Sequence, residues 1–196
     1  MAAFAVVVLL GLYAVYASGS SGASSASRTT PANDFQVGEP GVGAVAPLLS
    51  LASTTGGKVQ LADYRGKSVL LYFQEGLGCQ PCWEQLRDLE ARGPDLRAAG
   101  IDEILTVTTD PVDLLRQKAA DEGLKTPVLS DPDLAVSRAY ETNSYGMMGD
   151  SRNGHTFLLV APDGTITWRA DYGGAPKYTM FLPVDRVLAD LKAATA

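Results

Sequence analysis

The chain has 196 residues, of which 46% are hydrophobic and 19% are charged, and its formal net charge is −6 at pH 7. This length predicts one domain with an additional segment, and the acidic balance argues against a nucleic-acid-binding surface. Two cysteines and one histidine are too few for a closed structural zinc site with Cys and His ligands.

The first segment, residues 1–17, is almost entirely apolar and carries no charged side chain. It is slightly shorter than the ~20 apolar residues of a typical spanning helix. No Lys or Arg precedes the apolar run, although a signal peptide normally begins with one. We therefore predict an uncleaved membrane anchor, with a signal segment cleaved after Ala17 as the alternative.

Residues 18–36 are rich in Ser, Gly and Ala, which predicts a flexible tether. An anchor followed by a tether favours a soluble domain held on the extracytoplasmic side of a cell membrane. If the first segment is cleaved, the same domain would be secreted. The small number of cysteines is compatible with an oxidising compartment, where stray thiols are a hazard.

The predicted folded domain covers residues 37–196. An irregular stretch over 37–51 should end in a short strand, and a second short strand is expected over 58–61. The apolar run Val69–Phe73 is rich in β-formers and predicts the central strand.

The most informative motif is Cys79-Gln80-Pro81-Cys82, which follows that strand and opens a helical pattern running to about Arg92. Free backbone N–H groups and the dipole at a helix N-terminus should lower the thiol pKa of Cys79 and make it the attacking thiolate. Cys82, one turn inside, would resolve the mixed disulfide. Pro81 suits the first helical turn. A static structural disulfide is the weaker interpretation, because so short a loop removes little entropy from the unfolded chain.

The remaining pattern alternates strands and helices. Asp110 and Asp131 each precede a proline, and each is predicted to cap the helix that follows. A break is expected at Gly93-Pro94. The other expected elements are strands at 104–108, 128–129, 157–160 and 166–170, a turn at 162–165, loops at 141–156 and 171–181, and a last helix from Pro183. This order predicts an α/β domain whose mixed sheet has helices on both faces.

Several segments together resemble the thioredoxin fold, in the branch of the alkyl hydroperoxide reductase/thiol-specific antioxidant (redoxin) proteins and the membrane-tethered thiol-disulfide oxidoreductases. The resemblance covers residues 37–192, and the Cys-x-x-Cys after a strand is its most specific part. The matching segments are residues 46–48, 59–67, 69–73, 79–82 and 156–166.

This resemblance implies an enzyme that exchanges dithiols and disulfides, without an organic cofactor or a metal. Its partners would be protein disulfides and a thiol electron donor. Pro81 before the second cysteine resembles the reducing members, which implies a reductant of extracytoplasmic protein disulfides.

Peroxiredoxins carry a Pro-x-x-x-Thr/Ser-x-x-Cys pattern, and counting back from Cys82 gives Glu75 and Cys79 instead. A thiol-dependent peroxidase is therefore the alternative function. Thioredoxins place a buried Asp where this chain has Phe73, so Glu75 is a candidate proton acceptor, with a solvated loop acid as the other interpretation. Gly154 stands where thioredoxin-like proteins usually have a cis-proline facing the cysteines.

His155, the only histidine, lies opposite the cysteines in the register of the family, and Thr156 beside it is a further candidate. An imidazole near a thiolate could raise the thiolate population or relay protons. The alternative is a partly exposed loop residue. Met147 and Met148 could line a substrate groove, or form the copper site of a chaperone together with the cysteines and His155. Copper chaperones of this fold, however, use a wider cysteine spacing.

Overall fold

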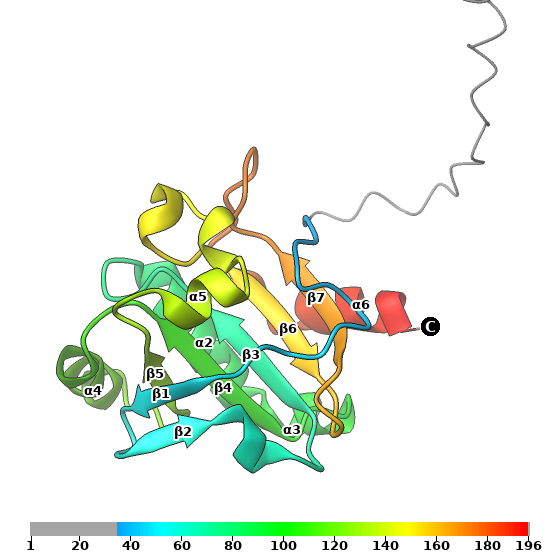
Figure 1. Ribbon diagram of the computed structural model, residues 1–196, viewed down its shortest axis with the longest axis horizontal. Helices are drawn as coiled ribbons and strands as arrows, with labels where there is room; N and C mark the ends of the chain where they lie inside the picture. Colours follow the sequence, from blue (N-terminus) through cyan, green and yellow to red (C-terminus); the bar gives the residue numbers. More distant parts are fainter. Residues whose placement is uncertain (1–34, 196) are drawn as a thin grey trace, which may run out of the picture. The chain divides into compact units, whose positions relative to one another are not determined.

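A seven-stranded mixed sheet forms the centre of the protein (Figure 1). The computed structural model describes residues 35–195. The strands are β1 (Ser50–Ser53), β2 (Lys58–Gln60), β3 (Val69–Phe73), β4 (Glu103–Thr108), β5 (Val128–Ser130), β6 (Thr156–Val160) and β7 (Ile166–Asp171). The α-helices are α2 (Gln80–Ala91), α3 (Gly93–Ala98), α4 (Val112–Asp121), α5 (Ala135–Ala139) and α6 (Val184–Thr195). Short 3-10 turns span Leu61–Tyr64, Thr142–Ser144 and Gly149–Ser151.

The strand order across the sheet is β2-β1-β5-β4-β3-β6-β7. The three central strands β5, β4 and β3 are parallel. The strands on both sides are antiparallel to their neighbours, with β6 on β3, β7 on β6, and the β1–β2 hairpin on β5. The predicted mixed sheet is therefore confirmed.

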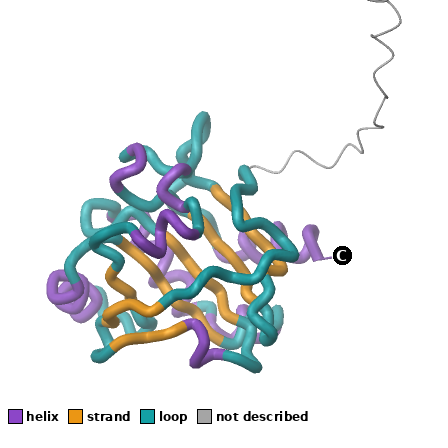
Figure 2. The backbone as a smooth tube through the Cα atoms, in the orientation of Figure 1, coloured by secondary structure: helices purple, strands orange, loops and turns teal. Residues whose placement is uncertain are grey.

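Helices cover both faces of the sheet, and β3 shows why (Figures 1 and 2). Alternate side chains of a strand point to opposite faces. Leu70 and Tyr72 join the core beneath α2, α3, α4 and α6. Leu71 and Phe73 join a second core beneath α5 and the segment that precedes β1. Both faces of β3 are buried, which explains its uninterrupted apolar sequence.

A fully buried ion pair holds the N-terminal lead-in against the sheet. Arg169 and Asp171 on β7 have side chains that are 0% exposed, and Arg169 Nε donates to Asp171 Oδ2 at 2.9 Å. Arg169 Nη1 also donates to the carbonyl oxygens of Tyr140 and Pro40. Asp171 Oδ2 accepts the Gly38 N–H at 2.8 Å. The pair thus connects β7, the end of α5 and the segment before β1.

Two helix starts differ from the prediction. Pro111, rather than Asp110, is the N-cap of α4 and forms no side-chain cap bond. Asp110 turns instead toward the loop after β3, where Leu77 N–H donates to it. The helix α5 begins at Ala135, later than the Asp131-Pro132 pattern suggested. Asp131 still satisfies free N–H groups of that helix, because its carboxylate accepts from the backbone of Ser137.

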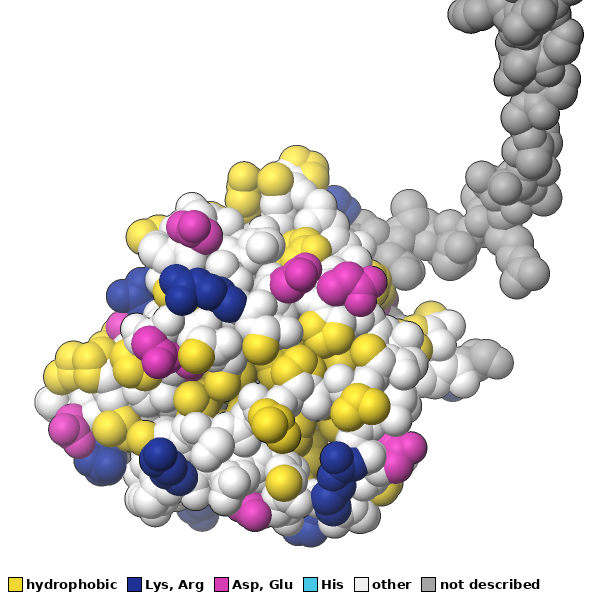
Figure 3. All heavy atoms as spheres, in the orientation of Figure 1, with side chains coloured by type: hydrophobic (Ala, Val, Ile, Leu, Met, Phe, Trp, Pro, Cys, Tyr) yellow, Lys and Arg dark blue, Asp and Glu magenta, His cyan; other side chains and the backbone are white. Residues whose placement is uncertain are grey.

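The predicted anchor over residues 1–17 and nearly all of the predicted tether over residues 18–36 lie outside the described residues. Within residues 35–195, the structure contains no helix with the length and apolar character needed to span a membrane. On the face in Figure 3, acidic and basic side chains are interspersed, so this face carries no extended basic patch.

Candidate active site

The two cysteines form a disulfide at the start of α2. Cys79 is the N-cap residue of this helix, and Cys82 lies in its first turn with Pro81. Their Cα atoms are 5.3 Å apart. Cys82 N–H donates to the carbonyl oxygen of Cys79, which starts the helix. The predicted strand, loop and helix thus bring both sulfur atoms to the helix N-terminus.

The two cysteines differ in exposure. Cys79 is 7% exposed and Cys82 is 0% exposed, and the two form one buried hydrophobic cluster with Met180, which is 8% exposed. A thiol attacking the disulfide from solvent therefore meets Cys79 first. The roles predicted for the two cysteines, with Cys79 attacking a partner disulfide and Cys82 resolving the mixed disulfide, stay a prediction.

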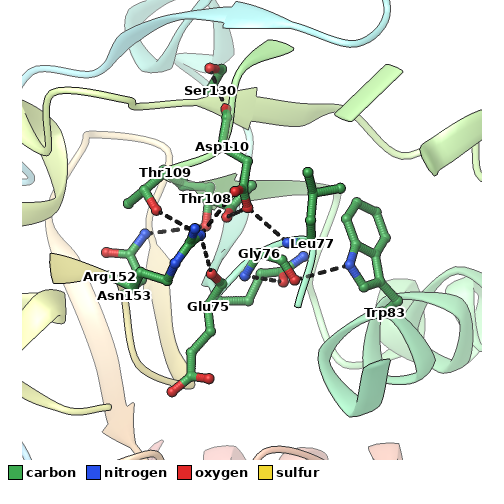
Figure 4. Close-up of polar contacts among 12 residues, drawn as sticks. Glu75, Gly76, Leu77, Trp83, Thr108, Thr109, Asp110, Ser130, Arg152 and Asn153 are labelled. Atoms are coloured by element: carbon green, nitrogen blue, oxygen red, sulfur yellow. Dashed lines mark hydrogen bonds and ion pairs between the residues drawn. The ribbon is translucent and has the colours of Figure 1, made fainter. Parts of the chain in front are cut away.

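Asp110 holds the loop between β3 and the disulfide (Figure 4). Its Oδ2 accepts the Leu77 N–H at 2.7 Å. Gly76 has a φ of +102°, and a Cβ at this position would lie 1.8 Å from Asp110 Oδ2. The indole Nε1–H of Trp83 donates to the Gly76 carbonyl at 3.1 Å. Only glycine allows this close approach, so Gly76 and Asp110 together fix the backbone that leads into Cys79.

Arg152 completes this polar cluster, and the sequence offered no local signal for it. Its Nη1 donates to the backbone carbonyl of Glu75 at 3.0 Å, to Asp110 Oδ1 at 2.9 Å and to Thr109 Oγ1 at 3.3 Å (Figure 4). The guanidinium thereby compensates the charge of the buried Asp110 carboxylate. Arg152 and Asp110 are far apart in sequence, and only the fold brings them together.

Glu75 is buried, with 7% exposure, so it is not the solvated loop acid that was the alternative interpretation. Its carboxylate points away from Arg152 (Figure 4) and accepts the Met147 N–H at 3.0 Å. Burial, with a smaller contribution from the Glu75 charge, raises the pKa of Tyr72 well above its ordinary value. The protonated Tyr72 hydroxyl donates to the Cys82 carbonyl at 3.3 Å. The Glu75 charge therefore lies within electrostatic range of the tyrosine that contacts Cys82.

His155 is fully buried, so the partly exposed loop residue is excluded. Burial lowers its pKa to about 4, and the imidazole is neutral at pH 7. Its Nδ1 is 2.8 Å from the Thr179 carbonyl oxygen, which makes Nδ1 the protonated nitrogen. A neutral ring supplies no positive charge for a thiolate. Its observed partner is instead the residue directly before Met180.

Gly154 packs closely against the backbone of Tyr145, and Thr156 is hydrogen-bonded to the buried ion pair. A Cβ on Gly154 would lie 1.4 Å from the Tyr145 carbonyl oxygen, so no other residue fits here without moving the backbone. Thr156 Oγ1 donates to Asp171 Oδ1 at 2.8 Å and thus supports the buried ion pair.

Met147 and Met148 are 54% and 55% exposed. His155 is buried in an aromatic cage with Tyr72 and Phe157 and is hydrogen-bonded to Thr179. The methionine that shares a buried cluster with the disulfide is Met180. Among the described residues, no group of three or more His, Cys, Asp or Glu side chains is placed to hold a metal ion.

Comparisons with known proteins match most of the domain to one family. The model of the AhpC/TSA family matches residues 42–169. A putative peroxiredoxin of Mycobacterium tuberculosis is 33% identical over 129 residues, which cover 63% of this chain and 80% of that protein. Peroxiredoxin Bcp of Escherichia coli is 33% identical over 128 residues, with 63% and 81% covered. Thiol-disulfide oxidoreductase ResA of Geobacillus kaustophilus is 35% identical over 100 residues, with 50% and 56% covered.

Solved structures agree with this match at the level of the fold. Peroxidoxin BcpB from Mycobacterium tuberculosis superposes with a TM-score of 0.64 at 19% identity, covering 78% of this chain and 96% of its own. Peroxiredoxin Q of Xanthomonas campestris gives a TM-score of 0.61 at 25% identity, covering 82% of this chain and 98% of its own. The described domain therefore has the thioredoxin-like α/β fold expected from the sequence.

Proposed function

The chain belongs to the AhpC/TSA family of thiol oxidoreductases, and from this premise we propose that it exchanges thiols and disulfides through Cys79 and Cys82. In the reduced enzyme, the Cys79 thiolate attacks one sulfur of a partner disulfide, and the partner's other sulfur leaves as a thiolate. The Cys82 thiolate then attacks Cys79 Sγ and releases the first partner sulfur. The partner gains two electrons, and the Cys79–Cys82 disulfide forms.

The observation that carries this proposal is the disulfide at a helix N-terminus, in which Cys79 is slightly exposed and Cys82 is fully buried. Cys79 is the N-cap of α2, where backbone N–H groups stabilise a thiolate. Cys82 is enclosed, so it is protected from other thiols while Cys79 is bound to a partner. A merely structural role is disfavoured because the disulfide joins residues only 3 apart in sequence.

The direction of electron flow is part of the proposal. The Cys-x-Pro-Cys form of the motif favours a reductant of protein disulfides, reduced again by another thiol protein. A measured reduction potential near that of reducing thioredoxins, about −270 mV, supports this direction, whereas a value near about −120 mV indicates an oxidant.

The test is trapping of a partner by single-cysteine variants. Cys82→Ser leaves Cys79 able to attack but removes the resolving thiol, so covalent complexes that dissolve in dithiothreitol should accumulate. The matched control is Cys79→Ser, which should trap far less because Cys82 is enclosed. Trapping only by Cys79→Ser reverses the two roles. No trapping by either variant, together with no reduction of insulin disulfides by the wild-type protein, excludes the proposed function.

A thiol-dependent peroxidase is the second candidate, since two of the relatives described above are named peroxiredoxins. Against it, Cys82 occupies the position of the reactive cysteine in the peroxiredoxin pattern but is 0% exposed. Stoichiometric formation of cysteine sulfenic acid with hydrogen peroxide, followed by thiol-dependent peroxide consumption, would favour this candidate. Insulin reduction without peroxide consumption would exclude it.

For the location, we propose a membrane-anchored, extracytoplasmic domain. The apolar, uncharged residues 2–17 and the Ser/Gly-rich stretch that follows them support this proposal. The full chain should stay in the membrane fraction after a carbonate wash, and a chain without residues 2–17 should be released. Recovery of a shortened chain without residues 1–17 in the soluble fraction after export indicates a cleaved signal, which is the alternative.

A further inference from the structure

The segment Thr179–Leu182, here called the Met180 strap, covers the disulfide. It belongs to the connection between β7 and α6, which rises at the upper edge of Figure 1. Met180 is 8% exposed and forms one buried cluster with Cys79 and Cys82. Its neighbour Phe181 is 39% exposed. The strap thus buries one apolar side chain over the sulfur atoms and leaves another partly exposed.

Two enclosed polar side chains hold the strap, one at each end. At the first end, His155 Nδ1–H donates to the Thr179 carbonyl at 2.8 Å. At the other end, the Leu182 N–H donates to Gln85 Oε1 at 2.6 Å. His155 and Gln85 are both 0% exposed. Gln85 lies one turn after Cys82 on α2, so the strap is fastened to the same helix that carries the disulfide.

Thiol-disulfide exchange needs more room at Cys79 than this arrangement provides. The incoming thiolate approaches Cys79 Sγ, a new S–S bond forms there, and the Cys79–Cys82 bond breaks with Cys82 leaving as a thiolate. With Met180 in place, only 7% of Cys79 is exposed. A compact dithiol can use such a narrow opening more readily than a cysteine embedded in a polypeptide.

We propose that Met180 is a specificity-determining residue, which the strap holds over Cys79 and which a partner polypeptide must displace. This inference rests on the proposed exchange at Cys79. The fit is to an apolar side chain beside the partner's cysteine, because Met180, whose place it would take, is itself an apolar side chain in one buried cluster with the two cysteines. His155 and Gln85 are positioning residues that set how readily the strap opens.

The test compares rates of reduction of the oxidised protein by two probes. The probes are dithiothreitol and a ten-residue peptide with one cysteine flanked by leucines. The new thiols of the protein are then measured by alkylation. Met180→Ala should raise the rate with the peptide by about tenfold, and the rate with dithiothreitol by much less. Met180→Leu restores an apolar side chain of similar volume and should return the peptide rate toward the wild-type value. Leu48→Ala, which removes an apolar side chain that is 92% exposed and lies outside the site, is the matched control.

A second variant leaves Met180 unchanged and tests the hydrogen bond that holds the strap to Gln85. Gln85→Leu removes the acceptor for the Leu182 N–H but keeps the side-chain volume, so it should also accelerate the peptide reaction. The inference is overturned if Met180→Ala leaves the ratio of peptide to dithiothreitol rates unchanged, or if Met180→Leu reacts as fast as Met180→Ala. If Met180→Ala does not fold, an unchanged ratio in Gln85→Leu overturns it.

Failure of the proposed function looks different from failure of this inference. Loss of the proposed function shows as a wild-type protein that is reduced by dithiothreitol but reduces no protein disulfide and traps no partner. The inference about Met180 is decided only by the ratio between the two probes.

Discussion

At the scale of single residues, burial decides what the polar groups around the disulfide can do. His155 would be partly protonated near neutral pH if it were exposed, but burial lowers its pKa to about 4. Burial also raises the pKa of Tyr72 well above its ordinary value, so its hydroxyl remains a donor to the Cys82 carbonyl. Both rings are therefore neutral hydrogen-bonding groups that shape the site.

The low pKa of His155 predicts a pH-dependent loss of stability. The native state takes up a proton only near pH 4, whereas the unfolded chain takes one up near the ordinary value of 6.5. Above pH 6.5 the protonation of His155 does not lower stability. As the pH drops to 4, the free energy of unfolding falls by about 3 kcal/mol, because the unfolded chain binds the proton more tightly than the native state does. Urea unfolding of the wild type and of His155→Gln should therefore show a stability difference that shrinks by this amount between pH 7 and pH 4. A constant difference would contradict the assignment, since the chain has no other histidine.

The buried Arg169–Asp171 pair predicts a large effect from a single substitution. Arg169→Met leaves the Asp171 carboxylate without its charged partner in a place that is 0% exposed, which should cost about 3–5 kcal/mol in the free energy of unfolding. Lys67→Met breaks an ion pair whose lysine side chain is 52% exposed and should change stability far less. Equal losses in denaturant titrations of the two variants would show that burial is not the cause.

At the scale of secondary-structure elements, the loops around the cysteines are held by side chains from distant elements. Asp110, which follows β4, fixes the loop after β3, and Arg152 fixes both. The carboxylate of Glu75 accepts the Met147 N–H and thereby holds the loop that contains Met147. The bonds to Leu77 N–H, to the Glu75 carbonyl and to Met147 N–H satisfy backbone groups of loops, which allows these loops to be buried.

The start of α5 offers a test of this kind of support. The Asp131 carboxylate accepts from Ser137 N–H at 2.7 Å and from Ser137 Oγ at 2.6 Å, and Asp131 is fully buried. Asp131→Ala should lower the free energy of unfolding by about 2 kcal/mol, since it leaves these donors without an acceptor. Asp133→Ala, in the exposed part of the same turn, should have a much smaller effect in a thermal or urea melt. Similar melts for the two variants would refute the capping role.

At the scale of the whole molecule, the fold is supported by the two cores on either side of the sheet and not by the disulfide. The cores contain the side chains of β3, β4 and β6, together with those of the helices on each face. The disulfide spans a sequence separation of 3 and constrains only one helical turn. The molecule can therefore alternate between its oxidised and reduced forms without rebuilding the sheet.

This independence predicts a small difference in stability between the two redox states. Loop-closure entropy for so short a loop amounts to about 2 kcal/mol at most, so reduced protein should keep its circular dichroism spectrum and unfold at slightly lower urea concentration. The double variant Cys79→Ala/Cys82→Ala should be insensitive to reductant. Unfolding of the wild type on reduction would assign the disulfide a structural role.

Much of the architecture follows from local patterns in the sequence. The apolar run Val69–Phe73 forms the central strand, and the Cys79–Cys82 motif opens the following helix, as predicted. The break at Gly93 also separates α2 from α3. These features are decided by short-range physics, namely side-chain periodicity, the fixed φ of proline and the free N–H groups of a helix start.

The tertiary structure alone decided how the site is enclosed. Nothing in the local sequence around Arg152 or Met180 points to the disulfide, because their partners lie tens of residues away in the chain. It also showed that Asp110 is not the N-cap of α4, and that the side chains of Asp110 and His155 form hydrogen bonds with distant backbone groups. Sequence patterns report which face of an element is buried, but they do not report which distant loop covers it. The position of the two cysteines at a helix start could therefore be predicted from the sequence, whereas access to them is set by the fold.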